Sequence, residues 1–406
     1  MVPAFLFFDA SPEALKVPLA MLAIFGTAKL LAELFERFGQ PGIVGEILAG
    51  VLIGPSVLGW IEPSELLTAL ADIGVMFLLF RVGLEVNPAE LLKLGGTATI
   101  VAIAGVIVPF LMGWGLLAWW GYPTIESVFV GAAMVATSVG ITAQVLASKG
   151  LLQERASRII LAAAVIDDVL GLLVLASVSS MARGQVNFLE IAITVGLAIG
   201  FVLIIATMGN RAVGKMMPRI QESMQVAEAE FALAMILLFA LAVLAVYVGV
   251  AAIVGAFFAG MALSGTVGRR VHDLSHGASE LLVPFFLAGI GLHVDLTAFR
   301  DSSMILLAVI LLLLACVSKF IGCGLSALPL GRSDALKIGV GMIPRGEVGM
   351  VVAQIGLTMG VLSQNIYGVV VFMAVATTLV APPLLKIAFA DVTPLVAAEE
   401  TVGLGA

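Results

Sequence analysis

The sequence has little charge, little cysteine and little histidine. Only 12% of its 406 residues are charged and 61% are hydrophobic, against about 25% and 45–50% in an ordinary soluble domain. Two cysteines cannot form a disulfide framework, and a net charge of −7 gives no polybasic surface for nucleic acid. The composition excludes an ordinary soluble protein, and the 44 glycines suit helices packed in lipid.

Long apolar runs make up most of the chain. A helix of about 20 residues crosses the roughly 30 Å of hydrocarbon in a bilayer. Turn residues and charges divide the sequence into 13 such runs, so we expect an all-α polytopic membrane protein with 13 transmembrane helices. The expected spans are 14–36, 41–59, 65–87, 95–120, 124–148, 156–181, 188–209, 226–248, 250–266, 278–294, 302–328, 333–360 and 363–389. Residues 1–12 lack the marks of a removable signal peptide.

The basic residues predict the orientation. With the N-terminus outside, 13 lysines and arginines lie in cytoplasmic loops and the tail, against three outside: Lys16, Arg183 and Arg300. Cytoplasmic loops carry an excess of Lys and Arg, and aromatic residues gather at the membrane interfaces. We therefore expect a multi-pass protein of the bacterial inner membrane, with an external N-terminus and a cytoplasmic C-terminus.

Short motifs recur at one offset. Ile43–Gly45 recurs as Ile253–Gly255, 210 residues later, and parts of Phe77–Val86 recur in Phe285–Val294, 208 residues later. The offset carries each span onto the one seven positions along, and because seven is odd the two halves must have inverted topology. Inverted repeats are the architecture of many secondary transporters.

The repeat predicts four regions. Residues 1–210 hold the first repeat and a linker helix (spans 1–7), and 211–225 form a cytoplasmic linker. Residues 226–389 hold the second, inverted repeat (spans 8–13), and 390–406 form a short cytoplasmic tail.

Five charged residues fall near span centres. They are Asp167 and Asp168 in span 6, Lys319 in span 11, and Arg345 with Glu347 in span 12. Each charge at a helix centre costs about 2.5–3.5 kcal/mol on insertion scales, so we expect these residues to be paired. Three negative and two positive charges leave one carboxylate in surplus. A monovalent cation and a proton would compete for it, which is the physical basis of exchange.

Two of the spans have centres that weaken a helix. Span 5 contains Ala136–Gly140, and span 12 contains Pro344 between two glycines. We expect both spans to be discontinuous crossing helices, because interrupted backbone inside a membrane is tolerated only where it lines a cavity or is buried in protein. Thr137 and Ser138 either line that cavity or bond to their own helix. Arg345, Glu347 and Pro344 are expected to stabilise the broken helix rather than to bind substrate.

Other polar residues lie nearer the span ends. Glu46, Glu85 and Arg81 lie toward the cytoplasmic ends and are candidates for a gate or for packing. Lys319 is a structural ion-pair partner or a participant in proton transfer, and the sequence leaves both possibilities open. The three histidines lie in or near loops, so we expect no resident metal site and no cofactor.

With these motifs the chain resembles the bacterial sodium/proton antiporters of the monovalent cation:proton antiporter-2 family, within the cation/proton antiporter superfamily. The resemblance covers about residues 14–389. The matching segments are Gly45–Gly50 before Gly54-Pro55, Phe80–Glu85, Ala136–Gly140, Ile166–Asp168 and Pro344–Glu347. The resemblance implies a homodimer in which a core domain, drawn in part from spans 3–6 and 10–13, slides against a dimerisation domain formed by the remaining spans.

The resemblance also implies roles for individual residues. Asp168 matches the residue that binds the ion, here Na+, and Asp167 matches the residue that pairs with a membrane lysine, here Lys319. Members with this Asp-Asp pair and lysine are electrogenic. The sequence therefore predicts a transporter rather than an enzyme, an electrogenic antiporter that exchanges Na+ or Li+ for H+ by alternating access.

Three other functions stay open at this point. The same fold can carry K+/H+ exchange or the sodium-coupled symport of an organic anion. A channel or ligand-gated membrane sensor without exchange is a third possibility, which the inverted repeat and the broken helices disfavour.

Overall fold

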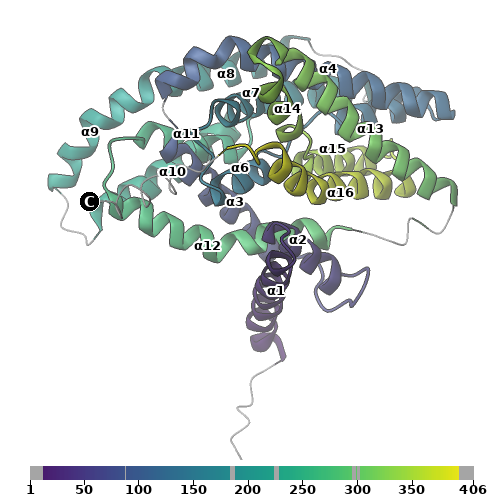
Figure 1. Ribbon diagram of the computed structural model, residues 1–406, viewed down its shortest axis with the longest axis horizontal. Helices are drawn as coiled ribbons and strands as arrows, with labels where there is room; N and C mark the ends of the chain where they lie inside the picture. Colours follow the sequence, from purple (N-terminus) through teal and green to yellow (C-terminus); the bar gives the residue numbers. More distant parts are fainter. Residues whose placement is uncertain are drawn as a thin grey trace, which may run out of the picture.

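The computed structural model describes residues 12–86, 88–182, 188–223, 228–294, 299 and 302–392 (Figure 1). Every regular element in these ranges is a helix. The elements are α1 (Pro12–Arg37), α2 (Gly42–Ile53), α3 (Glu65–Glu85), α4 (Pro88–Trp120), α5 (Thr124–Ala133), α6 (Val139–Ser148), α7 (Arg155–Ala182), α8 (Phe188–Ile204), the π-helical η1 (Ile205–Gly209), α9 (Asn210–Ser223), α10 (Ala229–Tyr247), α11 (Ala252–Leu263), α12 (Arg269–Leu292), α13 (Ser302–Ser326), the 3₁₀ turn η3 (Leu328–Leu330), α14 (Arg332–Gly341), α15 (Gly346–Thr358) and α16 (Gln364–Ala388). Arg183, Arg300 and the tail from residue 393, which entered the orientation argument, lie outside the described residues.

Nine helices in the described part of the chain are long and apolar enough to cross a membrane. They are α1, α3, α4, α7, α10, α12, α13, α16 and the stretch Gly196–Met217, which runs from α8 through η1 into α9. The protein is therefore an all-helical, multi-pass membrane protein. The remaining expected spans correspond to shorter helices, such as the 12-residue α2 and α11, which rise only about 18 Å each. The full count of 13 crossings stays a prediction.

Several boundaries differ from the sequence-based expectation: α2 ends at Ile53 and not at 59, and α4 begins at Pro88 and not at 95. Helix α12 begins at Arg269, nine residues before the expected start of span 10 at 278. The polar residues between His272 and Glu280 lower the hydropathy of this stretch, but they continue the helix beyond its apolar part. The expected cytoplasmic linker also begins as a helix, because α9 continues η1 directly from Asn210.

Both expected interruptions are present. Helix α5 ends at Ala133 and α6 begins at Val139, so Met134–Ser138 are not helical. Helix α14 ends at Gly341 and α15 begins at Gly346, with Pro344 in the gap. Proline has no backbone N–H and disfavours helical geometry in the residue before it, which explains the position of the second break.

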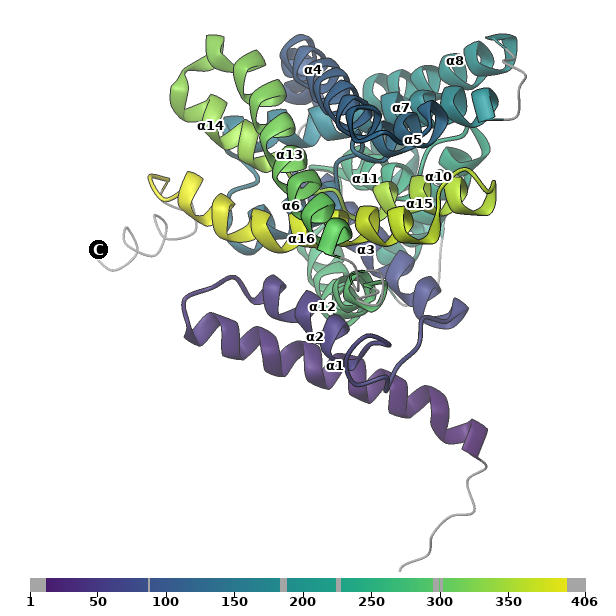
Figure 2. The same cartoon turned by 90° about the vertical axis from the view of Figure 1, so that its right-hand side faces the viewer.

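The helices pack in two groups. In the first, α4, α5, α7, α13, α14, α15 and α16 contact one another; in the second, α1, α2, α3, α10, α11 and α12 do so. Figure 2 shows α1 along one edge of the molecule, with α2 between it and α12. Three of the four halves of the broken helices, α5, α14 and α15, therefore lie in the first group, and α6 packs on α7 and α16 of that group and on α3 of the second.

Close helix contacts in the second group recur at the offset of the sequence repeat. A Cβ on Gly50 of α2 would overlap the carbonyl of Ala288 in α12, and a Cβ on Gly260 of α11 would overlap the carbonyl of Phe80 in α3. Gly260 lies 210 residues after Gly50, and Ala288 lies 208 after Phe80. The same glycine-mediated contact thus occurs twice at equivalent positions; the inverted topology of the two halves stays a prediction.

Gly50→Ala is expected to destabilise the protein by about 1–3 kcal/mol, because the added methyl group forces α2 away from α12. Gly26→Ala is the matched control, since a Cβ on Gly26 of α1 meets nothing within 4 Å. Alanine is the better helix former, so the control should be neutral or slightly stabilising. Unfolding in detergent micelles measures both; equal stabilities for the two variants would contradict the tight α2–α12 contact.

Candidate functional site

The two interrupted helices bond to each other at their breaks. The backbone N–H of Ser138 donates to the carbonyl of Pro344 over 2.8 Å. The hydroxyl of Thr142 in α6 donates to the carbonyl of Gly341, the last residue of α14, over 2.7 Å. Helix ends leave backbone groups without intrahelical partners, and inside a membrane no water is available to satisfy them. Each break therefore supplies partners for the other.

Gly346 lets the two breaks approach closely. Its φ is +59°, in the left-handed region that side chains disfavour, and a Cβ there would lie 2.5 Å from the Ser138 side chain. Ser138 is fully buried. Its side chain therefore lies against the start of α15.

Arg345, at the second break, hydrogen-bonds to the first break and to helix α13. Its guanidinium is fully buried and donates to the carbonyls of Val135 and Ala136 over 3.4 and 3.5 Å, and to that of Ala315 in α13 over 3.0 Å. Its backbone N–H donates to the Thr377 hydroxyl of α16. These contacts suit a role in stabilising the broken helix, and that role stays a prediction. The Glu347 side chain, expected to share that task, lies outside the described side chains.

Asp167 and Lys319 form a completely buried ion pair. The Lys319 Nζ of α13 lies 2.9 Å from Oδ1 and 3.1 Å from Oδ2 of Asp167 in α7, and both side chains have zero exposure. The contact expected from the resemblance is thus present. Burial of both charges is tolerable because each neutralises the other, and loss of either partner would leave one charge uncompensated.

Asp168 places a second carboxylate beside this pair. It follows Asp167 on α7, is 4% exposed, and lies about 100° further around the helix. Two turns earlier on α7, Ile160 packs so closely on Gly341 of α14 that a Cβ on that glycine would overlap it. Helix α7, which carries both aspartates, therefore packs against the end of α14 at the second break.

Thr137, at the first break, is 1% exposed, and its hydroxyl has no hydrogen-bond partner among the described residues. A buried polar group without a partner is costly. It is therefore available as a ligand for an ion or a water molecule. A bond of Thr137 to its own helix, the alternative use that the sequence left open, is not formed in this conformation.

Gly105 was not identified from the sequence. A Cβ on this residue of α4 would lie 2.7 Å from the Cys323 Sγ and 3.2 Å from the Lys319 Nζ. The missing side chain lets α13 bring Lys319 close to α4 and toward Asp167. A glycine in an apolar helix carries no sequence signal for this use, because the requirement comes from packing between two distant segments.

The three candidate gate residues contact other parts of the protein. Glu46 of α2 pairs with Lys29 of α1 over 2.9 Å, and Arg81 of α3 lies 2.8 Å from the His276 Nδ1 of α12. The carbonyl of Glu85 accepts a hydrogen bond from the Gln153 side chain, which links α3 to the α6–α7 loop. These contacts suit packing as well as gating, so the gate role stays a prediction.

A membrane bundle in which two broken helices meet beside buried charges has the construction of a secondary transporter. The comparison with known families agrees. Residues 20–390 match the model described as "Sodium/hydrogen exchanger, transmembrane". The chain belongs to this sodium/hydrogen exchanger family, a family of transporters.

Individual relatives cover nearly the whole chain. It is 35% identical to the Na+/H+-K+ antiporter GerN of Bacillus cereus, over 89% of this chain and 94% of that protein. It is 32% identical to the high-affinity Na+/H+ antiporter NhaS3 of Synechocystis, over 92% and 90%. The fold is similar to the sodium proton antiporter MjNhaP1 of Methanocaldococcus jannaschii, with a TM-score of 0.72 at 16% identity over 94% and 97% of the two chains.

Arg345→Lys is expected to destabilise the protein by about 2–3 kcal/mol, because one ammonium group cannot replace the forked contacts to three carbonyls. Arg37→Lys is the control: Arg37 pairs with Glu33 at the surface, with 74% of its side chain exposed, and should change stability by less than about 0.5 kcal/mol. Unfolding of both variants in detergent tests this. An Arg345→Lys protein as stable as the control would mean that the guanidinium does not hold the breaks together.

Proposed function

We propose that this chain is an electrogenic antiporter that exchanges Na+ or Li+ for H+, with Asp168 as the group that binds cation and proton in turn. The observation that carries the proposal is the buried Asp167–Lys319 pair on α7 and α13, with a second carboxylate on the next residue of α7. The pair is neutral by itself. A cation and a proton both bind to carboxylate oxygens, and the two would therefore compete for Asp168.

The Lys319 pair supplies a route to electrogenic exchange. When Asp168 binds a cation it releases its proton, and Lys319 would separate from Asp167 and release a second proton to water. When the cation leaves, one proton returns to Asp168 and one to Lys319, which pairs with Asp167 again. Two protons therefore move for each cation, and net charge moves. Thr137 would add a neutral oxygen ligand beside the carboxylate, since its hydroxyl is buried and available.

The packing supports movement between two groups of helices. The proposed core comprises α4, α5/α6, α7, α13, α14/α15 and α16, and it carries both breaks and all the buried charges described above. We assign α3 and α12 to the other group, because they pack chiefly on each other, with α3 also on α11 and α12 also on α2; the sequence had placed part of spans 3 and 10 in the core. The proposal has four further parts. The two groups slide against each other to give alternating access, and the two halves of the chain have inverted topology. The protein is a homodimer in the inner membrane, with its N-terminus outside.

Potassium is the alternative cargo with a specific observation in its favour, since GerN, which is 35% identical to this chain, is named as an Na+/H+-K+ antiporter. Selectivity depends on the radius of the site and on the number of oxygen ligands around the carboxylate. The sodium-coupled symport of an organic anion is the other alternative of the same fold.

A cation series on reconstituted protein tests the cargo. Proteoliposomes with an acidic interior receive Na+, Li+, K+ or choline at equal ionic strength, and the decay of the pH gradient is followed with a fluorescent amine. The proposal predicts that Na+ and Li+ dissipate the gradient and that choline does not. Dissipation by K+ alone supports the potassium alternative, and dissipation only when an organic anion accompanies Na+ supports symport.

A further inference from the structure

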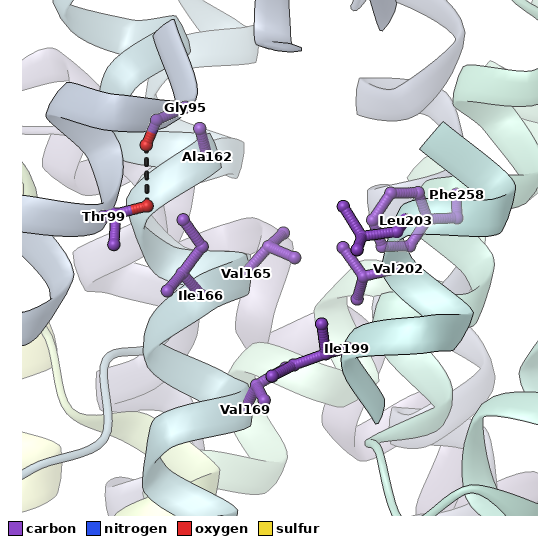
Figure 3. A pocket seen from close by; sticks show the side chains of 10 residues that line it. All are labelled: Gly95, Thr99, Ala162, Val165, Ile166, Val169, Ile199, Val202, Leu203 and Phe258. Atoms are coloured by element: carbon purple, nitrogen blue, oxygen red, sulfur yellow. Dashed lines mark hydrogen bonds between the residues drawn. The ribbon is translucent and has the colours of Figure 1, made fainter. Parts of the chain in front are cut away.

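A cavity of about 310 Å³ lies between α7 and α8, and α4 and α11 complete its wall (Figure 3). Helix α7 contributes one side of the lining and α8 the opposite side. The lining residues are Ala162, Val165, Ile166 and Val169 of α7 and Ile199, Val202 and Leu203 of α8. The cavity therefore separates two helices of the proposed core from two helices that lie outside it.

The lining is apolar with one exception. The hydroxyl of Thr99 is the exception, and it already donates to the carbonyl of Gly95 in its own helix over 2.7 Å (Figure 3). No lining side chain offers a hydrogen bond to an ion or to its water shell. Apolar cavities of this kind stay dry or bind apolar molecules.

The cavity also lies on the opposite face of α7 from the Asp167–Lys319 ion pair. At about 100° per residue, Val165 and Val169 each lie about 160° around α7 from Asp167. The Lys319 contact is therefore on the far face of the helix, and Asp168 lies between the two faces. The cavity is a separate feature and not an extension of the Asp167–Lys319 site.

The α8 wall continues into an exposed apolar surface of the same helix, which we expect the bilayer to cover. Ile199 and Leu203 are 47% and 52% exposed, and Ile193 and Leu197 on the same helix are exposed to a similar extent. An apolar chain from the bilayer can therefore reach the cavity along α8 without crossing a polar surface. The volume is about twice the ~150 Å³ of an apolar cavity known to hold benzene, so it accommodates a chain segment of about a dozen carbons.

We propose that one acyl chain of a membrane lipid inserts between α7 and α8 and occupies this cavity. The chain would lie where the core must move against its neighbours, so its presence would slow transport. That consequence rests on the proposed function, whereas the binding itself does not.

The test uses photolabelling in vesicles of phosphatidylcholine that contain a phosphatidylcholine with a diazirine near the end of one acyl chain. After irradiation, mass spectrometry locates the adducts. Val202→Trp fills the cavity, and Leu197→Trp is the matched control, because Leu197 lies on the same helix but does not line the cavity. Ile199→Trp replaces Val202→Trp if the latter does not remain monodisperse.

The proposal predicts adducts on α7 between Ala162 and Val169 in the wild type and in Leu197→Trp. These adducts should fall by about tenfold in Val202→Trp, since displacement of only two buried methylenes removes that much affinity. Undiminished α7 labelling in Val202→Trp would overturn the proposal. So would a wild type in which the lipid probe labels only the outer face of α8, or in which a small water-soluble diazirine labels this α7 segment instead.

Transport is measured on the same samples. Cation-dependent dissipation of a pH gradient reports on the proposed function, and adduct formation needs no transport. A protein that forms the α7 adduct but exchanges no cation would refute the function and leave the acyl site intact. A protein that exchanges cation without the adduct would refute only the acyl site.

Discussion

Asp168→Asn is expected to abolish sodium/proton exchange while the fold is retained. The amide neither binds a cation by charge nor releases a proton at working pH. Loss of one partner from a buried charge interaction weakens binding by more than about 100-fold, or roughly 3 kcal/mol. Because asparagine has nearly the size and shape of aspartate, the variant should remain folded at this site, which is only 4% exposed.

Two measurements separate loss of function from loss of fold. In proteoliposomes the variant should leave an imposed pH gradient intact when Na+ is added. In detergent, sodium should raise the melting temperature of the wild type, because a ligand that binds the native state stabilises it, and this increase should disappear in the variant. Asp273→Asn, on an exposed part of α12, is the control and should keep both responses. An Asp168→Asn protein that still exchanges sodium would contradict the assignment of the site.

Lys319→Met is expected to destabilise the protein by about 3–5 kcal/mol, because Asp167 then remains buried and charged without its partner. The double variant Asp167→Asn/Lys319→Met should recover most of that loss, since a neutral pair of similar size leaves no uncompensated charge. Unfolding in detergent for the wild type, both single variants and the double variant gives the interaction energy directly. Additive effects would show that the 2.9 Å contact is not a coupled pair.

Lys337→Met provides a matched control for this cycle. Lys337 of α14 is also largely buried, but its partner Asp391 keeps 62% of its side chain exposed. The hydrogen bond from Lys337 holds the pKa of Asp391 below its ordinary value, and after the substitution that carboxylate is solvated by water. The loss of stability should therefore be far below that of Lys319→Met.

The features that follow from local chemistry were predictable from the sequence. Pro344 with its flanking glycines marks the second break, and apolar length marks α3, α7, α13 and α16 within a residue or two of their ends. The start of α12 was missed because hydropathy finds the part of a helix in lipid and not its polar extension. The polar part of a helix that extends beyond the membrane is found by helical periodicity and not by mean hydropathy.

The candidate site was predictable only in part. The sequence identified the charged residues, and the family resemblance identified Lys319 as the partner of Asp167. It did not identify the carbonyls of Val135, Ala136 and Ala315 as the partners of Arg345, because every residue has a carbonyl. It also missed Gly105, whose importance comes from the approach of α13 to α4. Such contacts are properties of packing between segments far apart in the chain.

Coupled flux at a controlled membrane potential tests the central claim most directly. Proteoliposomes are clamped with potassium and valinomycin, an inward sodium gradient is imposed, and sodium uptake and internal pH are recorded together. The account predicts that sodium entry drives proton exit, that more protons than sodium ions move, and that the membrane potential alters the rate. Sodium uptake without proton movement would contradict antiport, and one-for-one exchange indifferent to potential would contradict the electrogenic mechanism built on Asp168, Asp167 and Lys319.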